Sequence, residues 1–329
     1  LKFSGIIGLS AFGILIFANV GNIILGFFLS SEFIGYYAAI ITIISGVMGT
    51  LSIGGVLYPI FTQLNKEKLK EAFRKAFHYM SIITLPIAIG LSFIILPVIK
   101  ILYGIEYVPQ EYEFALSITA ILFSLIIIET IFSNLYKMLF DAKEKPAIPA
   151  SIIAIASIFN MFLNLILVSF LIKISPSFGL IGVAAATFIT RYGVLIALAI
   201  SSKNKLNISP QRDSIIKPLI ASFLMLCYFF IFTRIIHLNI FKGIIMILSG
   251  AVFYMLILFL IKGLDINELN KKIGETDFLI TTESSCSEDT HLSKTNYFNI
   301  CLSDERTRDV SNISCCMIAV FAFEHLKNH

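Results

Sequence analysis

The sequence predicts an all-α polytopic membrane protein with about eight transmembrane helices. Of its 329 residues, 57% are apolar and only 14% are charged, whereas a soluble domain has about 45–50% apolar and about 25% charged residues. So few polar residues cannot cover the surface of a water-soluble globule, which excludes that class. Eight apolar runs each reach the about 20 residues that a helix needs to cross the hydrocarbon core. The runs are continuously apolar and do not alternate as barrel strands do, so they indicate helices.

The predicted membrane region covers residues 1–262. Its spans lie near residues 5–29, 33–61, 79–101, 114–139, 148–172, 180–200, 215–236 and 240–261. No small-residue cleavage site follows the first span, so we expect no cleavable signal peptide. Residues 63–78 place apolar side chains at helical intervals between charges, which predicts an interfacial helix leading into the third span.

Lysine and arginine alternate between loops and predict the orientation. The loops after the second, fourth and sixth spans are basic, and the loops after the other spans are poorer in these residues. The basic loops carry Lys66, Lys68, Lys70, Arg74, Lys75, Lys143, Lys145, Lys203, Lys205, Arg212 and Lys217. Because basic loops stay in the cytoplasm, we expect a multi-pass protein of the cytoplasmic membrane with both ends of the eight-span region inside.

The composition changes after Lys262. Residues 263–329 are polar and slightly acidic, and they hold four of the five cysteines. The cysteine spacing fits no zinc pattern. This predicts a polar, poorly ordered cytoplasmic tail with free thiols.

Polar side chains inside the spans are the candidates for function, because they are expensive in lipid and normally face a bundle interior or a water-filled cavity. In the fourth span Glu129, Ser133, Tyr136 and Lys137 fall on one helical stripe, with Asn134 beside it. The candidate residues of a substrate or ion pathway are Glu129, Asn134, Lys137, Asn160, Asn164, Arg191, Asn19 and Asn22.

Each candidate has a structural alternative. The asparagines can form interhelical hydrogen bonds that fix packing without any ligand. Glu129 and Arg191 can pair with each other, since a lone buried charge neutralises or finds a partner. If they line a polar cavity instead, Glu129 is the best candidate for a titrating or cation-binding group. Lys137 is a weaker candidate, because it is close enough to the interface to extend its amine there.

Small residues are concentrated in two spans. The second span contains Gly35, Gly46, Gly49, Gly54, Gly55 and Pro59, a density that suggests a moving element. In the sixth span Gly182 precedes three alanines, which predicts close contact with another helix.

Motifs of other classes do not occur. The sequence has no Walker motif, no His-Glu-x-x-His, no Gly-x-Ser-x-Gly and no cluster of metal ligands. The net charge of +4 is scattered, so nucleic-acid binding is not expected. A membrane chain without an enzyme motif or a cofactor site is most simply a transporter or channel subunit.

The order of segments resembles the polysaccharide flippases of the superfamily that includes the multidrug and toxin extrusion transporters. The likeness rests on six stretches that together cover about residues 1–262. They are residues 26–37 (GFFLSSEFIGYY), 58–76 (YPIFTQLNKEKLKEAFRKA), 102–109 (LYGIEYVP), 141–146 (DAKEKP), 160–168 (NMFLNLILV) and 179–191 (GLIGVAAATFITR).

The resemblance implies one bundle plus two additional helices, equivalent to the C-terminal half of a two-bundle flippase. It also implies flipping of a polyprenyl-linked oligosaccharide between leaflets by alternating access, with H⁺ or Na⁺ as the coupling ion and membrane lipid around the protein. We then expect an N-terminally incomplete chain that works with a missing N-terminal bundle or a second copy. Relatives often carry charges where this chain has Asn19 and Asn22, which weakens a cation-assisted role there.

Two other functions are compatible with the residues. A multidrug or small-cation exporter of the same fold would favour deep acidic groups, of which Glu129 is the one candidate in the spans. A non-transporting scaffold of a glycan-assembly complex would leave the intramembrane charges paired and inert.

Overall fold

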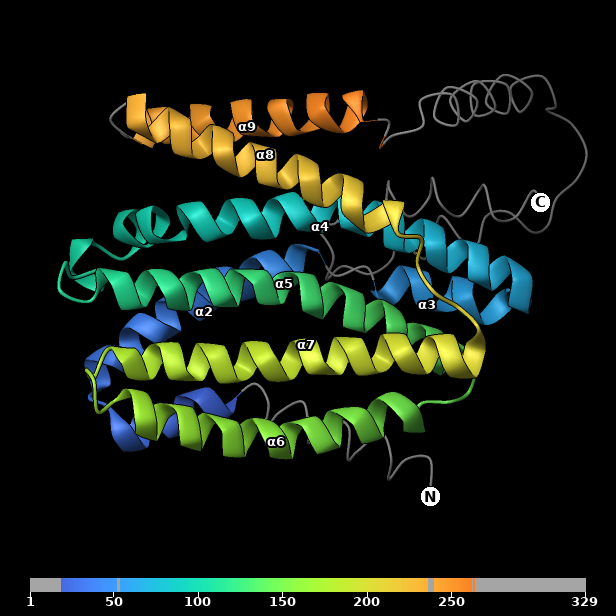
Figure 1. The fold of residues 1–329 in the computed structure, drawn as a ribbon, viewed down its shortest axis with the longest axis horizontal. Helices are drawn as coiled ribbons and strands as arrows, with labels where there is room; N and C mark the ends of the chain where they lie inside the picture. The colour runs from blue at the N-terminus through green and yellow to red at the C-terminus, as the bar shows by residue number, and fades with distance from the viewer. Residues whose placement is uncertain (1–18, 52–53, 236–239, 262, 264–329) are drawn as a thin grey trace, which may run out of the picture.

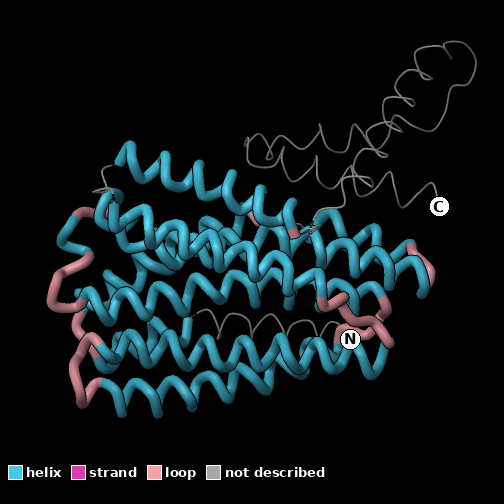
Figure 2. Tube along the Cα trace, turned by 45° about the horizontal axis from the view of Figure 1, so that its top comes forward, coloured by secondary structure: helices cyan, strands magenta, loops and turns pink. Residues whose placement is uncertain are grey.

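The computed structural model describes residues 19–51, 54–235, 240–261 and 263 (Figure 1). These residues form helices joined by short loops, without a strand in the described part (Figure 2). Helical residues Asn19–Phe28 are followed by α2 (Ser31–Thr50), α3 (Gly54–Gln63), α4 (Lys66–Leu102), the short 3₁₀ helix η1 (Ile105–Tyr107), α5 (Glu113–Ala142), α6 (Ala147–Leu171), α7 (Phe178–Leu206), α8 (Asp213–Ile235) and α9 (Ile240–Leu260). The predicted all-α class is confirmed.

Six of the described helices are long and apolar enough to cross a membrane: α2, α4, α5, α6, α7 and α8. Two shorter apolar helices, Asn19–Phe28 and Ile245–Leu260, accompany them. Most of the predicted first span, and the predicted tail beyond Gly263, lie outside the described residues. The chain is therefore a multi-pass helical membrane protein.

The predicted span over residues 33–61 corresponds to two helices in the structure. The structure divides this range into α2 and the ten-residue α3. Glycine has poor helix propensity, and a proline ring clashes with the preceding helical turn. The glycine-rich stretch that suggested a moving element thus coincides with a break between two helices, and α3 alone is too short to cross a bilayer.

The predicted helix over residues 63–78 forms the first turns of α4 and leads without a break into the third span. Asn65 caps the N-terminus of α4 by accepting a hydrogen bond from the Lys68 backbone N–H (3.0 Å). From there α4 continues for 37 residues, about 55 Å at 1.5 Å per residue. The apolar face of its first turns packs inside the protein, where Phe77 stacks on Phe132 of α5 with ring centroids 4.3 Å apart. Protein contacts, rather than the membrane surface, bury this amphipathic face.

The long helices lie side by side in the order α6, α7, α5, α4, α8 and α9 (Figure 1). Helices α2 and α3 pack against α5. One large apolar core joins α2 through α7, and a second, smaller cluster joins α8 and α9 to α4. This arrangement agrees with one bundle plus two additional helices.

The three predicted basic loops meet at one end of the bundle, which we call the basic end. It comprises the connections between α3 and α4, between α5 and α6, and between α7 and α8. Arg74 Nε donates to the backbone oxygen of Ser209 (3.2 Å), and Lys143 Nζ donates to that of Leu64 (3.3 Å). These bonds tie loops that are far apart in the sequence into one surface.

The opposite end of the bundle is aromatic and contains a partly exposed ion pair. Lys100 Nζ lies 2.8 Å from Glu113 Oε1 across the connection between α4 and α5. Aromatic rings within 5.1–6.5 Å of each other gather beside it. They belong to Phe33, Tyr36, Tyr103, Tyr107 and Tyr112. Tyrosine is enriched where a membrane protein leaves the hydrocarbon, so this end is suited to a membrane–water interface.

Candidate functional site

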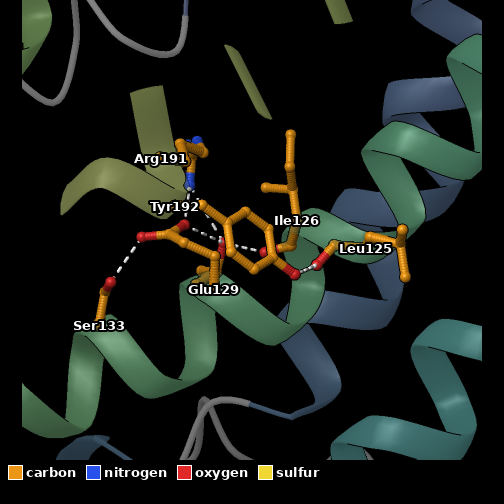
Figure 3. A network of polar contacts seen from close by, with 7 residues as sticks. Leu125, Ile126, Glu129, Ser133, Arg191 and Tyr192 are labelled. Carbon is orange, nitrogen blue, oxygen red and sulfur yellow. Dashed lines mark hydrogen bonds and ion pairs between the residues drawn. The ribbon is translucent and has the colours of Figure 1, made fainter. Parts of the chain in front are cut away.

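A buried ion pair joins the middle of α5 to α7 (Figure 3). Arg191 Nη1 lies 3.1 Å from Glu129 Oε2. The side chain of Glu129 is 4% exposed and that of Arg191 is 27% exposed. Glu129 stands roughly 20 Å along α5 from the basic end, counting about 1.5 Å per residue to Ala142. The pair that the sequence offered as one alternative is therefore formed, deep inside the bundle.

Both oxygens of the Glu129 carboxylate accept hydrogen bonds. Ser133, one turn later in α5, donates its hydroxyl to Oε1 (2.5 Å). Arg191 donates to Oε2, and the same guanidinium nitrogen also lies 3.1 Å from the Thr130 hydroxyl oxygen. A carboxylate this buried is expensive unless it is paired and hydrogen-bonded, and these contacts satisfy both conditions.

Two residues of this network were missed by sequence reasoning. Thr130 donates its single hydroxyl proton to the backbone oxygen of Ile126 (2.9 Å) and accepts from Arg191. Tyr192 donates its hydroxyl to the backbone oxygen of Leu125 (2.9 Å), which adds a second link between α7 and α5 (Figure 3). Their positions directly after Glu129 and Arg191 were the available signal, because polar neighbours of a buried charge often complete its network.

Lys137 and Asn134 follow Glu129 along α5, as the helical stripe predicted. Both are half-buried. Lys137 lies two turns closer to the basic end than Glu129 and only five residues before the end of α5. The structure thus places a second cation between the ion pair and the basic end.

Asn160 and Asn164 form a second polar group, on α6. Asn164 Nδ2 donates to the side-chain oxygen of Asn160 (3.1 Å) and to its backbone oxygen (2.9 Å). Asn160 Nδ2 reaches the backbone oxygen of Ala186 in α7 at 3.5 Å. Both side chains are buried, and Asn164 Oδ1 has no hydrogen-bond partner among the described residues. This group combines the predicted interhelical contact with one unsatisfied buried acceptor.

Asn19 and Asn22 are not part of either group. Their side chains are exposed on the helical residues Asn19–Phe28, whereas the ion pair and the asparagine pair are buried. The eight predicted residues therefore fall into a central pair, an α5 stripe, an α6 pair and an exposed N-terminal pair.

The chemistry available at the central pair is charge pairing and hydrogen bonding. No group of three His, Cys, Asp or Glu side chains that could hold a metal ion occurs in the part of the chain that the structure describes. The pair links two neighbouring helices, so any process that separates α5 from α7 must break it or supply new partners for both charges.

Comparison with known proteins gives a family match and a fold match. Residues 1–110 match a family described as "Polysaccharide biosynthesis protein". The fold is similar to that of the lipid II flippase MurJ in its inward closed conformation, with a TM-score of 0.62 and 20% sequence identity. No curated protein matches the sequence.

The structural match covers 76% of this chain and 50% of MurJ, so the chain spans about half the length of that protein. At this identity the likeness establishes the fold, while the family match rests on the sequence of the first 110 residues. The first finding compares sequences and the second compares folds, and the two agree. Together they confirm the predicted resemblance of this chain to a polysaccharide flippase-type family.

Proposed function

We propose that the protein belongs to a transporter that flips a polyprenyl-linked oligosaccharide across the cytoplasmic membrane by alternating access. The observation that carries this proposal is a membrane-crossing bundle of the MurJ fold whose N-terminal third matches a polysaccharide biosynthesis family. The described residues add what such a substrate requires: polar groups at mid-bundle depth for a sugar and cations for a diphosphate.

The proposed orientation places the basic end in the cytoplasm. The loops and helix ends gathered there carry eleven lysines and arginines, and such basic regions remain on the cytoplasmic side. Lys137 and then Arg191 would be the cations that a diphosphate meets on its way from that end, with Asn134 beside them on the α5 stripe. Asn160 and Asn164 would contact sugar hydroxyls.

A second bundle is part of the proposal, either on a separate chain or on a second copy. The exposed side of α2 supports it, because this side carries small and weakly polar residues: Ala38, Thr42, Ser45, Gly46 and Gly49. The exposed side of α6 instead carries large apolar residues suited to lipid: Ile155, Phe159, Phe162, Ile166 and Phe170. Small residues allow close approach of another helix, and they leave room for a hydrophilic path lined by Asn19 and Asn22.

Ion coupling completes the proposal, with H⁺ or Na⁺ as the driving ion. Glu129 is the candidate group, since binding of either ion to its carboxylate would compete with Arg191. Loss of the pair would free α7 to move relative to α5, which gives the bundle two arrangements.

Proteoliposomes that contain a fluorescent polyprenyl-diphosphate oligosaccharide test the function directly. A membrane-impermeant quencher reports the outer leaflet, so flipping appears as an additional quenched fraction over time. We expect flipping above protein-free vesicles when the chain is reconstituted with the first bundle of a flippase as a separate chain. Absence of flipping both with and without that bundle would refute transport.

The Glu129→Gln variant tests the role of the central pair. Glutamine keeps the shape and the bond from Ser133 but removes the charge, so we expect the flipping rate to fall at least about tenfold, which corresponds to a barrier higher by about 1.4 kcal/mol. The matched control is Glu113→Gln, which removes the exposed pair with Lys100 at the opposite end. It should flip at the wild-type rate, and equal rates in all three proteins would exclude Glu129 from transport.

One observation favours a second candidate, a non-transporting scaffold for a glycan-assembly complex. The intramembrane charges are paired with each other, as that function requires. The exchanged variant Glu129→Arg with Arg191→Glu separates the two functions. A scaffold should keep wild-type stability and complex assembly with the pair reversed, whereas a transporter should keep stability but lose coupling to the ion gradient.

A further inference from the structure

The basic end carries an excess of cations that the described residues do not neutralise. Residues 63–75, 141–146 and 203–217 hold eleven lysines and arginines against five acidic residues. Two local ion pairs, Lys75 with Glu71 and Lys217 with Asp213, account for part of this charge. Seven basic side chains of this end form no ion pair with another described residue: Lys66, Lys68, Lys70, Lys145, Lys203, Lys205 and Arg212.

The position of these cations distinguishes them from an ordinary interfacial ring. The hydrogen bonds of Arg74 and Lys143 draw three loops together over the ends of the central helices α4 and α5. Lipid headgroups surround a bundle, whereas this surface covers its end. Such a surface is suited to a soluble acidic segment.

The chain itself contains a segment with the opposite charge. Residues 264–329 have eleven acidic and six basic residues. Within them, residues 273–293 have no lysine or arginine and carry five acids: Glu275, Asp277, Glu283, Glu288 and Asp289. The net charge of −5 in 21 residues complements the excess of +6 at the basic end.

The last described helix runs back toward the basic end. Helix α8 begins at the basic end and α9 returns antiparallel to it (Figure 1). The Gly263 N–H then bonds to the backbone oxygen of Leu258 (2.8 Å), which closes the last turn. The ten residue-to-residue steps from Gly263 to residue 273 reach up to about 33 Å, enough to cross the ends of several helices of about 10 Å diameter.

We propose that the acidic segment 273–293 docks on the cationic surface formed by the three loops of the basic end. Several exposed ion pairs, each weak alone, act together there. The tether raises the effective concentration of the segment to about the millimolar range, so a low intrinsic affinity is sufficient. Salt or a competing anion would release the segment from this surface.

Crosslinking from one native cysteine tests the contact in the full chain. Cys227, Cys301, Cys315 and Cys316 are replaced by serine, which leaves Cys286 inside the acidic segment. A short amine-to-thiol reagent then joins Cys286 to lysines within reach, and peptide mass spectrometry identifies them. In roughly 50 mM salt, where charge screening is weak, we expect products with the lysines of the basic end. We expect none with Lys173, which is exposed in the connection between α6 and α7 at the opposite end.

A charge variant decides whether the contact is electrostatic. Replacing the five acids of residues 273–293 by their amides keeps Cys286 reactive, and the yield should fall at least about fivefold, as it should in roughly 500 mM salt. The matched control replaces Asp304, Glu305 and Asp309 instead and should keep the full yield. Equal yields in both variants would overturn the proposal.

Varying the lipid composition tests whether anionic lipid headgroups, rather than the acidic segment, occupy this surface. The same reaction is carried out in nanodiscs of phosphatidylcholine and in nanodiscs with about one third phosphatidylglycerol. Retention of the crosslinks in both supports docking of the chain's own segment. Their loss in the anionic discs would assign the surface to lipid headgroups and overturn the proposal, without bearing on the flipping assay.

Discussion

Replacing Arg191 by glutamine is expected to destabilise the protein by about 3–5 kcal/mol, because it leaves the Glu129 carboxylate buried without its cation. The Ser133 hydroxyl still donates to that carboxylate, but one neutral hydrogen bond does not compensate a charge that is 4% exposed. The chain has no tryptophan. Stability is therefore better measured as the fraction of monodisperse protein that survives heating in detergent, by size-exclusion chromatography.

The partner variant should be milder. In Glu129→Gln the remaining cation is the more exposed member of the pair and can turn toward a polar neighbour, while glutamine still accepts from Ser133. Glu113→Gln, which breaks the exposed pair at the opposite end, should change stability by less than about 1 kcal/mol.

The double variant with glutamine at both positions completes the double-mutant cycle. It should be more stable than Arg191→Gln alone, since no unpaired charge remains buried. If Arg191→Gln survives heating as well as the wild type, the pair is not a structural link and the barrier to separating α5 from α7 must lie elsewhere.

Sequence reasoning offered this pair as one of two alternatives, because an unpaired charge inside an apolar span is energetically expensive. Glu129 and Arg191 are 62 residues apart, yet each lies in an apolar span where an unpaired charge is expensive. The same argument did not reach Thr130 or Tyr192. Whether a hydroxyl joins such a network depends on the rotation and register of two packed helices, and neither is visible in the spacing along one of them.

The helices, too, were predicted only in part from the sequence. Apolar runs predicted the all-α class because composition and run length determine it. They did not predict the break between α2 and α3, since residues 33–61 are apolar on both sides of it. Amphipathic spacing did not show whether Phe73 and Phe77 pack against other helices or against the membrane surface. Either environment would bury the same apolar face of the helix.

The contact between α6 and α7 should be sensitive to added volume. A Cβ atom at Gly182 would lie 3.1 Å from the backbone nitrogen and Cα of Val168 in α6, and backbone inside a helix cannot move aside cheaply. Close approach at this position is what the small residues of the sixth span predicted. Alanine at Gly182 should therefore cost about 1–3 kcal/mol.

Leucine at Gly182 should have the larger effect, because α6 must then separate from α7 along its length. That separation also breaks the hydrogen bond from Asn160 Nδ2 to the backbone oxygen of Ala186, which leaves buried polar groups without a partner. We expect this variant to be absent from the monodisperse fraction after purification.

The matched control is Gly193 in the same helix, which is exposed and where an added Cβ atom would have nothing within 4 Å. Alanine at Gly193 should stabilise the helix by about 0.5–1 kcal/mol through propensity alone. If substitution at Gly182 is tolerated as well as at Gly193, α6 is not held against α7 by close packing, and the asparagine pair must hold the two helices together instead.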